Sequence, residues 1–382
     1  MRIGVVCFAA IGGSSTVAAS LAGHLVAAGH SVFLLASAPP ERLHPHSGVL
    51  FRAIPDAGNP LRPGSTAEVQ RLAHAIAAVA LEDSLDIVHA HYANPHAVAA
   101  VAAREMLPAA RRPTVVTTLH GTDVTMAPDV APDVAPAISA ALFASDGVSA
   151  VSPFLADAAV MSLGIPRPVV IPNCIERVSS SPLSDIERRI HFRSERVLLH
   201  VSTLRPVKRA VDCVGILARV NRRVRCRLLV VGEGPDAGAM HSEAVRLGVA
   251  DTISFVGATA HVGPYFAQAD VLLLPSACES FGMAALEAMA AGVPVVGTRV
   301  GGLTGVVAEG VCGRLLPVGD LDGMAAAACE LLMQHRLAEA YGHAGRRLAR
   351  ERYAPDGVIA AYRALYDAAR ARHATRLLSE AP

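Results

Sequence analysis

The chain has 382 residues, of which 52% are hydrophobic and 18% are charged, and its formal net charge is +1. This length is typical of two domains, and the near-neutral charge argues against a general affinity for nucleic acid, so any anion site must be local. Trp is absent and only 4% of the residues are aromatic, which argues against a stacking platform for bases or long sugar chains.

The N-terminal segment admits two interpretations. Arg2 followed by the apolar stretch Ile3–Ile11 resembles a short signal peptide, but it also fits a buried strand, a glycine turn and a helix. We favour the strand, because the helical pattern continues to Ala28 and ends at Gly29. Elsewhere the sequence has no run of about 18 apolar residues, so we expect no membrane span.

Two series of short apolar runs alternate with helical patterns such as Thr16–Ala28 and Glu68–Ala80. Apolar runs separated by helices predict parallel strands buried on both faces, and therefore two doubly wound α/β domains. The first series comprises Ile3–Phe8, Val32–Ala36, Ile87–Ala90, Val115–Thr118, Gly147–Val151 and Val169–Ile171. The second comprises Val197–Val201, Arg227–Val231, Ile253–Phe255, Val271–Leu274, Val295–Gly297 and Gly313–Leu316.

The domains are predicted to span residues 1–175 and 190–356. A segment rich in Pro and Ser separates them, and Gly357–Arg370 has the pattern of a terminal helix. The Ala-Pro-Asp-Val repeat at Ala127–Val134 predicts a surface loop before a helix that begins near Ala137.

The cysteines are scattered, odd in number and never spaced as C-x-x-C, which favours reduced thiols in the cytoplasm over a disulfide framework or a zinc site. They are Cys7, Cys174, Cys213, Cys226, Cys278, Cys312 and Cys329.

Polar motifs follow the predicted strands, where ligands bind in open α/β sheets. Gly12–Thr16 opens the first helix, so its backbone amides either bind an anion or form a simple turn. Thr117–Asp123 places His120 after a strand. This histidine either contacts a substrate, with Asp123 orienting its imidazole, or is a satisfied structural histidine.

Two further motifs belong to the second series. Arg205 and Lys208, in the loop Ser202–Arg209, supply the cations that a diphosphate needs, although such a run is also typical of a solvated surface. Gly232 and Gly234 either let a nucleobase lie against the backbone or form an ordinary tight turn.

The most informative motif is Glu279–Glu287, which follows the predicted strand Val271–Leu274. A helix is expected to begin near Gly282 and to carry Glu287 just over one turn further on. Carboxylates accept hydrogen bonds from vicinal hydroxyls, and the free amides of 281–283 favour a diphosphate. Together these groups predict a site for a nucleotide-linked sugar.

With these motifs the sequence resembles glycosyltransferase family 4, from Met1 to about Tyr366. The resemblance implies the GT-B fold, in which two Rossmann-like domains face each other across a cleft and a C-terminal helix (here 357–382) packs back on the first. Within the family, Gly12–Ser14, His89–Ala97 and Gly297–Gly302 resemble bacterial members of the bacillithiol pathway, which move N-acetylglucosamine from UDP to L-malate.

The resemblance also implies roles for individual residues. Arg205 and Lys208 grip the diphosphate, Glu287 holds the ribose, and His120 and Glu279 contact the transferred sugar. The anomeric configuration is retained, and no metal is required because the cations replace it. Further implied donor contacts are Gly13, Gly232, Gly234, Ser280, Phe281, Gly282 and Met283, and the implied acceptor contacts are Ser14, Tyr92, Asn94 and Thr118.

Four departures from the family pattern leave alternatives open. Ser15 and Asn94 lie on the acceptor side, Thr203 precedes the cationic loop, and Thr304-Gly305 replaces the usual Pro-Glu. The partners are a small-molecule donor and acceptor, but a different small acceptor and a GDP-linked donor remain alternatives. A UDP-sugar epimerase and a non-catalytic sugar-nucleotide-binding protein are more remote ones, and a homodimer is a candidate assembly.

Overall fold

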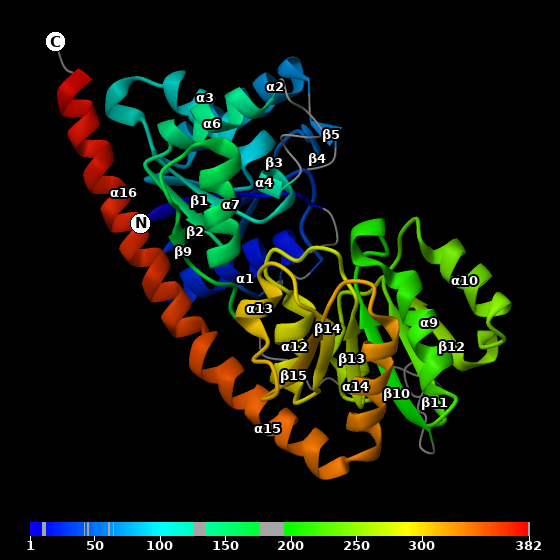
Figure 1. Ribbon diagram of the computed structural model, residues 1–382. Coiled ribbons are helices and arrows are strands. Elements are labelled where there is room, and N and C mark those ends of the chain that lie inside the picture. The colour runs from blue at the N-terminus through cyan, green and yellow to red at the C-terminus, as the bar shows by residue number, and fades with distance from the viewer. Residues whose placement is uncertain are drawn as a thin grey trace. The chain divides into compact units, whose positions relative to one another are not determined.

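The computed structural model describes residues 1–9, 13–41, 43, 46–59, 62–63, 65–125, 134–175 and 195–380 (Figure 1). Contacts divide the chain into one unit formed by Met1–Cys174 with Pro355–Pro382 and a second formed by Ile175–Ala354. Gly12, most of the predicted repeat loop and most of the predicted linker lie outside the described residues.

The first unit contains a parallel sheet of seven strands in the order β3-β2-β1-β6-β7-β8-β9. The N-terminal segment forms the interior strand β1, between β2 and β6, which confirms the prediction of a strand. The edge strand β3 was not predicted, because its residues are half-buried or exposed and its short apolar run is interrupted by Arg52. The strands are β1 (Arg2–Val6), β2 (Ser31–Ala36), β3 (Leu50–Ala53), β6 (Ile87–His91), β7 (Thr114–Leu119), β8 (Gly147–Ala150) and β9 (Val169–Val170), with a separate antiparallel pair β4 (Gly58–Asn59) and β5 (Arg62–Pro63).

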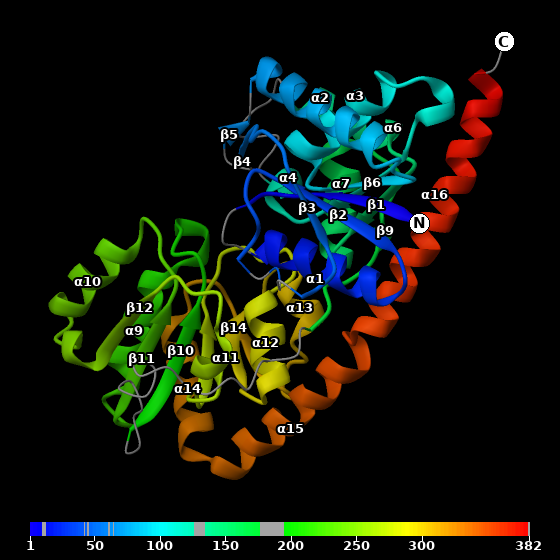
Figure 2. The same ribbon diagram turned by 180° about the vertical axis from the view of Figure 1, so that it is seen from behind.

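Helices cover both faces of this sheet. Successive residues of a strand point to opposite faces, so each strand contributes side chains to two separate cores. Val5 packs in a core with α1 and α16, whereas Val6 packs in a core with α2 and α3. Figure 2 shows α16 running alongside α1 and the sheet of this unit. The helices are α1 (Gly13–Ala27), α2 (Thr66–Glu82), α3 (Val98–Glu105), α4 (Thr122–Thr125), α6 (Ala135–Ala144), α7 (Pro153–Leu163) and α16 (Pro355–Glu380), with the short turns η1 (Ala93–Ala97) and η2 (Ala109–Arg111).

The terminal helix α16 is longer at both ends than the predicted Gly357–Arg370. Its extension is held by the buried carboxylate of Asp146, which lies 2.8 Å from the Arg376 guanidinium and 3.5 Å from the His373 ring. Arg104 of α3 pairs with the same carboxylate at 3.2 Å. Ion pairs therefore fix the C-terminal end of α16 to the first unit.

The second unit contains a parallel sheet of six strands in the order β12-β11-β10-β13-β14-β15. Its main core joins α9 and α14 to alternate strand residues, while α12 packs on β13 and β14. The strands are β10 (Arg196–Val201), β11 (Cys226–Val231), β12 (Ile253–Gly257), β13 (Val271–Leu274), β14 (Val295–Thr298) and β15 (Gly313–Leu316). The helices are η3 (Pro206–Lys208), α9 (Ala210–Val220), α10 (Ala237–Arg246), η4 (Ala250–Thr252), α11 (Gly263–Phe266), α12 (Met283–Ala291), α13 (Leu303–Val306), α14 (Leu321–Met333) and α15 (His335–Arg352).

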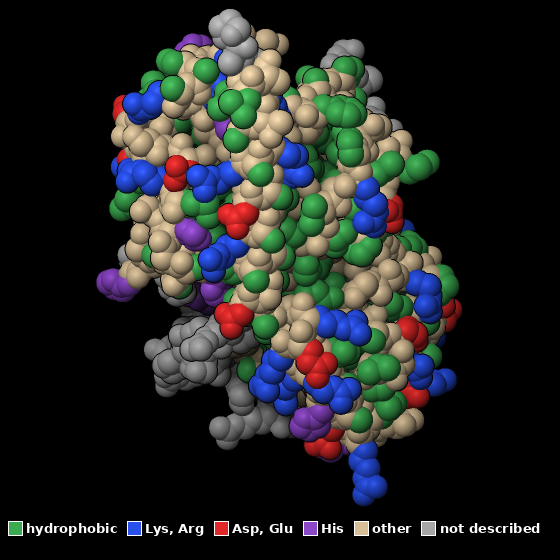
Figure 3. Space-filling model, turned by 90° about the vertical axis from the view of Figure 1, so that its left-hand side faces the viewer, with side chains coloured by type: hydrophobic (Ala, Val, Ile, Leu, Met, Phe, Trp, Pro, Cys, Tyr) green, Lys and Arg blue, Asp and Glu red, His purple; other side chains and the backbone are tan. Residues whose placement is uncertain are grey.

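Both units are therefore doubly wound Rossmann-like domains, as predicted. All seven cysteines are free, and five of them are buried. None of the helices in the described part of the chain combines the length and hydropathy that a bilayer-spanning segment needs. On the face drawn in Figure 3, basic and acidic side chains are interspersed, in keeping with the small net charge.

Candidate functional site

The predicted site residues form two groups, one in each unit, and nearly all follow the carboxyl ends of parallel strands. In the first unit they follow β1, β6 and β7, and in the second they follow β10, β11 and β13. We call the first group, with its neighbours, the histidine region (Gly13, Ser14, His89, His91, Tyr92, Asn94, Thr118, His120 and Asp123). We call the second the charged region (Arg205, Lys208, Gly232, Gly234, Glu279–Met283 and Glu287).

Stacked imidazoles lie at the ends of β6 and β7. The Nδ1 of His91 is 2.9 Å from the Nε2 of His120, and the two rings stack with their centroids 5.0 Å apart. Burial lowers the pKa of His120 and of His89 to about 3 and holds the pKa of His91 well below its usual range. All three rings are therefore neutral near pH 7, so His120 offers hydrogen bonds without a charge.

Asp123 has a different role from the predicted one. Its carboxylate accepts hydrogen bonds from the backbone amides of Gly121 at 2.7 Å, Ala93 at 3.0 Å and His120 at 3.3 Å. Burial raises its pKa to about 6, against the effect of these amides. The imidazole of His120 instead bonds His91, so Asp123 ties together the backbone turns after β6 and β7 and does not orient that ring.

The aromatic ring of Tyr92 packs beside the imidazole of His120. The two rings stack with centroids 5.2 Å apart, and the Phe8 ring meets the Tyr92 ring edge-on. The Thr122 hydroxyl lies 3.5 Å from the Tyr92 hydroxyl. This aromatic surface is half-buried and follows β6 directly, whereas Asn94 is buried within η1.

The structure corrects the predicted contact of Thr118 with an acceptor. Its side chain is fully buried, and its Oγ1 lies 2.7 Å from the Nε2 of His89 and 2.8 Å from the Oγ of Ser149. The Thr118 hydroxyl is therefore part of an internal hydrogen-bond network. In contrast, Gly13 is exposed and Ser14 is half-buried in the first turn of α1.

In the charged region, Lys208 and Glu279 form an ion pair across two loops. The Nζ of Lys208 is 2.8 Å from the Oε1 of Glu279, which also accepts a hydrogen bond from Ser276 at 2.8 Å. A backbone bond from Ala277 to Val207 joins the same loops at 2.8 Å. The two residues predicted to act on diphosphate and sugar are therefore direct partners.

The other cations of this loop are arranged differently. Arg205 is half-buried and donates from its Nε to the Thr203 hydroxyl at 3.3 Å. Arg209 pairs with Asp212 of its own helix at 2.7 Å, in keeping with the solvated alternative for that residue. Of the three cations in this loop, Lys208 and Arg209 are thus paired with carboxylates, whereas Arg205 contacts a hydroxyl in the described structure.

The glycines of the turn after β11 are required by close backbone packing. Gly232 has φ 131°, and a Cβ there would lie 1.8 Å from the carbonyl oxygen of Ser202. A Cβ at Gly234 would lie 2.4 Å from the oxygen of Leu204. These contacts support the interpretation as a tight turn, which holds the β11 turn against the loop after β10.

The start of α12 presents backbone groups. Gly282 has φ 103° and precedes Met283, the first residue of the helix, while the Phe281 ring is buried edge-on against Tyr353. Ser280 and Glu287 are half-buried on either side of this turn. Phe281 can therefore contribute to a ligand site through its backbone and not through its ring.

Three supporting residues received no predicted role of their own from the sequence, although two of them, His89 and Gly302, lie in motifs that carry the family resemblance. His200 is buried within β10 and bonds the Ser202 hydroxyl at 2.7 Å, and His89 is buried within β6. A histidine inside an apolar strand was the available signal for both. Gly302 supports the Glu279 loop, since its amide donates to the Glu279 carbonyl at 2.7 Å and a Cβ there would meet the Ser280 oxygen at 2.1 Å.

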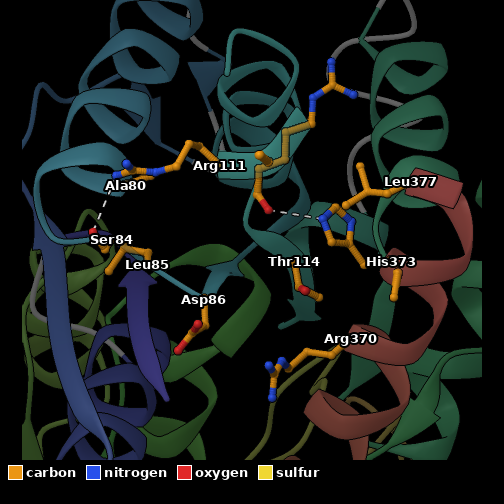
Figure 4. Close-up of a pocket in the computed structure, with 12 residues that line it drawn as sticks. Ala80, Ser84, Leu85, Asp86, Arg111, Thr114, Arg370, His373 and Leu377 are labelled. Carbon is orange, nitrogen blue, oxygen red and sulfur yellow. Dashed lines mark hydrogen bonds between the residues drawn. The ribbon is translucent and has the colours of Figure 1, made fainter. Parts of the chain in front are cut away.

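A pocket of about 390 Å³ lies elsewhere in the first unit, near the amino ends of β6 and β7. Figure 4 shows Arg370 and His373 of α16 facing Asp86 and Arg111 around it. It contains none of the predicted site residues, so it is not the candidate active site. Within the described ranges, no cluster of His, Cys, Asp and Glu is arranged to hold a metal ion.

Comparisons with known proteins find matches in both units. Residues 11–177 match the family model "Glycosyltransferase Family 4" and residues 195–334 match "Glycosyl transferases group 1". The chain is 32% identical to the N-acetyl-alpha-D-glucosaminyl L-malate synthase of Bacillus anthracis over 96% of both chains. It is 31% identical to the phosphatidyl-myo-inositol mannosyltransferase of Mycolicibacterium smegmatis over 89% of this chain and 87% of that protein.

Solved structures show the same fold. The sucrose-phosphate synthase of Thermosynechococcus elongatus superposes with a TM-score of 0.80 at 22% identity, over 96% of this chain and 98% of that one. The HepE protein of Anabaena in complex with UDP-glucose superposes with a TM-score of 0.79 at 19% identity, over 95% and 99% of the two chains.

Proposed function

The chain belongs to glycosyltransferase family 4 and has the GT-B fold, and we propose that it moves N-acetylglucosamine from UDP-N-acetylglucosamine to the hydroxyl of L-malate with retention of configuration. The similarity to the Bacillus anthracis synthase over nearly the whole chain supports this donor and acceptor. All seven cysteines are free, which supports a reducing, cytoplasmic setting.

The observation that carries the proposal is the Lys208–Glu279 pair beside Arg205 and the start of α12. A departing diphosphate develops negative charge, which cations and the amino end of a helix stabilise. Lys208 and Arg205 supply the cations, and the amides that lead into α12 supply the dipole. No metal is required in this scheme, because the two side chains provide the positive charge.

Carboxylates in the same region select the sugar parts of the donor. Glu279 lies 2.8 Å from Lys208, so the hydroxyls that it binds are held next to the leaving group. Glu287 lies on α12 and is half-buried, and its carboxylate accepts hydrogen bonds from the ribose hydroxyls. Donor binding shifts Lys208 from Glu279 toward the diphosphate, which leaves Glu279 available to the sugar.

The transfer step exchanges one bond at the sugar C1 for another, beside the neutral imidazole of His120. The bond from the sugar C1 to the phosphate oxygen breaks as the acceptor oxygen bonds C1 on the same face. The acceptor proton passes to the departing phosphate oxygen. Positive charge develops on the sugar during this exchange, and a neutral His120 can donate or accept a hydrogen bond without repelling that charge.

One observation favours a variant of this function. Thr304 and Gly305 are exposed at α13, where the family pattern has Pro-Glu, and Asn94 departs from the pattern on the acceptor side. Loss of the glutamate removes a negative group near the donor loops. The second candidate is therefore a family 4 transferase that uses a different small acceptor and a GDP-linked sugar.

The test is a matrix of donors and acceptors with purified protein. UDP-N-acetylglucosamine, UDP-glucose and GDP-mannose are each combined with L-malate, D-malate, a thiol and a cyclitol, and products are identified by mass and by the NMR signal of the anomeric proton. We expect malate-dependent release of UDP and an α-linked product. Conversion of the donor without any acceptor indicates an epimerase instead, and binding without turnover indicates a non-catalytic protein.

A further inference from the structure

The C-terminal helix α16 reaches the base of the histidine region with two buried tyrosines. The hydroxyl of Tyr366 lies 2.9 Å from the Nδ1 of His89, although the two residues are 277 positions apart. One turn earlier, the hydroxyl of Tyr362 lies 3.4 Å from the Oγ1 of Thr118. Both tyrosines are at most 2% exposed, and Figures 1 and 2 show α16 along the sheet that they reach.

A chain of hydrogen bonds continues from Tyr366 through the sheet. The Nε2 of His89 is 2.7 Å from the Oγ1 of Thr118, which is 2.8 Å from the Oγ of Ser149. The chain therefore crosses α16, β6, β7 and β8. Each member is buried, so none of these polar groups can exchange its partner for bulk water.

His89 is the element of this chain that needs partners on both sides. Burial lowers its pKa to about 3, so at neutral pH its ring has one N–H donor and one acceptor nitrogen. Hydroxyl groups stand on both sides and can donate or accept, which satisfies either tautomer. Removal of the Tyr366 hydroxyl leaves the Nδ1 of His89 without this partner and frees the ring to change tautomer or rotate.

Contacts connect His89 to the residues at the ends of β6 and β7. Its ring lies against the His91 ring, with centroids 4.5 Å apart, and His91 bonds His120 at 2.9 Å. The Nε2 of His91 is buried without a hydrogen-bond partner among the described residues. The His91 ring is therefore held by ring contacts and by one hydrogen bond to His120. The orientation of the His91 ring is thus sensitive to the position of the His89 ring.

Thr118 provides a second connection. Its carbonyl accepts a hydrogen bond from the amide of Tyr92 at 3.0 Å, and its hydroxyl is the partner of His89. Tyr92 in turn stacks on His120. Both routes from His89 end at the surface formed by Tyr92 and His120.

We propose that Tyr366 is a positioning residue for the transfer reaction, acting through His89 and Thr118 to hold His120 and Tyr92 in their reactive geometry. The proposal rests on the proposed function for its kinetic consequence, but not for its structural one. Small displacements of groups that position a substrate change rates strongly. The C-terminal helix thus contributes to the active site, besides completing the first unit.

The kinetic experiment compares Tyr366→Phe with the matched variant Tyr362→Phe. The two changes remove one hydroxyl each from buried tyrosines one helical turn apart, and the Tyr362 contact is the longer one, at 3.4 Å against 2.9 Å. We expect Tyr366→Phe to lower kcat/KM for the acceptor about tenfold, while Tyr362→Phe, which loses the longer contact with Thr118 and keeps the bond between Tyr366 and His89, lowers it by no more than about threefold. UDP affinity and the melting temperature should be similar in both variants. Equal kinetics in the two variants, or a parallel loss of UDP affinity, overturns the proposal.

A second measurement does not depend on turnover. Spectra of ¹⁵N-labelled histidine report the tautomer of each imidazole in the full-length protein. Tyr366→Phe should change the signals of His89, His91 and His120 and leave that of His200 in the second unit unchanged. If only the His89 signal changes, the linkage to His120 does not exist and the proposal is wrong. If the spectra change as expected but no acceptor is glycosylated by the wild-type protein, the proposed function fails and the linkage stands.

Discussion

The histidine region and the charged region differ in how their polar groups find partners. At the centre of the first are neutral imidazoles and hydroxyls whose hydrogen bonds are made within the protein, with His89 and Thr118 both fully buried. The second contains full charges that remain partly accessible, with side-chain exposures of 19% for Lys208 and 10% for Glu279. A diphosphate needs cations that can be reached, whereas an acceptor and a sugar ring need fixed, uncharged hydrogen-bonding groups.

This difference predicts different responses to perturbation. An ion pair exchanges its partner when a stronger anion arrives, so the charged region should adapt on donor binding. A buried neutral network loses a hydrogen bond outright when one member changes, because water cannot replace it. Changes in the charged region should therefore act on the donor, and acidification should act first on the histidine region.

The largest effect is expected from Lys208→Ala, which removes the cation nearest to Glu279. We expect kcat/KM for the donor to fall about 100-fold, or about 2.7 kcal/mol of transition-state stabilisation. Steady-state kinetics measure the loss. Arg209→Ala is the matched control, because Arg209 pairs with Asp212 on its own helix, and it should stay within about twofold. Equal losses in the two variants contradict the assignment of Lys208.

Acidification tests the prediction for the histidine region. The pKa values of His89 and His120 are lowered to about 3 and that of His96 to about 4, so between these values and pH 6.5 the unfolded chain binds more protons than the folded one. Stability is therefore lost as the pH falls below 6.5. Asp123, with its pKa raised to about 6, opposes this loss, because its folded form takes up a proton first.

The net change follows from these opposed signs. Each of these three histidines contributes about 1 kcal/mol of destabilisation between pH 6.5 and 5.5, and Asp123 returns a little less than that, so the four groups together lower the stability of the first unit by about 2 kcal/mol. His91, whose pKa is also held well below its usual range, adds to this loss. Urea unfolding at the two pH values measures it. An unchanged or higher urea midpoint at pH 5.5 shows that the histidines are not held neutral.

A smaller effect is expected from Glu279→Gln, which separates the two parts of the charged region. The amide keeps the shape of the side chain but removes the anion that binds Lys208. Turnover should fall about tenfold, or about 1.4 kcal/mol, while UDP binds at least as tightly as before because Lys208 is released. Rates and UDP titrations are compared with Glu243→Gln, a change in an exposed ion pair on α10. Weaker UDP binding in Glu279→Gln contradicts the exchange of partners by Lys208.

The strands and the site loops were predictable from the sequence because their signals are local. Buried parallel strands are continuous apolar runs, and each motif follows one of them. Strand β3 escaped prediction because it is a half-buried edge whose Arg52 pairs with Asp83 at 2.8 Å. The end of α16 escaped because an ion cluster around Asp146, far away in sequence, holds it.

The partners of the site residues were not predictable, because they come from distant parts of the chain. Lys208 and Glu279 are 71 positions apart, and no spacing rule pairs them. Thr118 was predicted to face the acceptor, but its hydroxyl contacts His89, Ser149 and Tyr362 of α16. Asp123 was predicted to orient the His120 ring, but its carboxylate accepts hydrogen bonds from nearby backbone amides instead.

The central claim is that the charged region binds a nucleotide diphosphate through Lys208 and the ribose through Glu287. Calorimetric titration with UDP tests it most directly, using the wild-type protein, Lys208→Ala and Glu287→Ala at one salt concentration. The account predicts saturable binding by the wild type and at least about tenfold weaker binding by each variant, or about 1.4 kcal/mol. Equal UDP affinity in all three proteins, or no binding by the wild type, contradicts it.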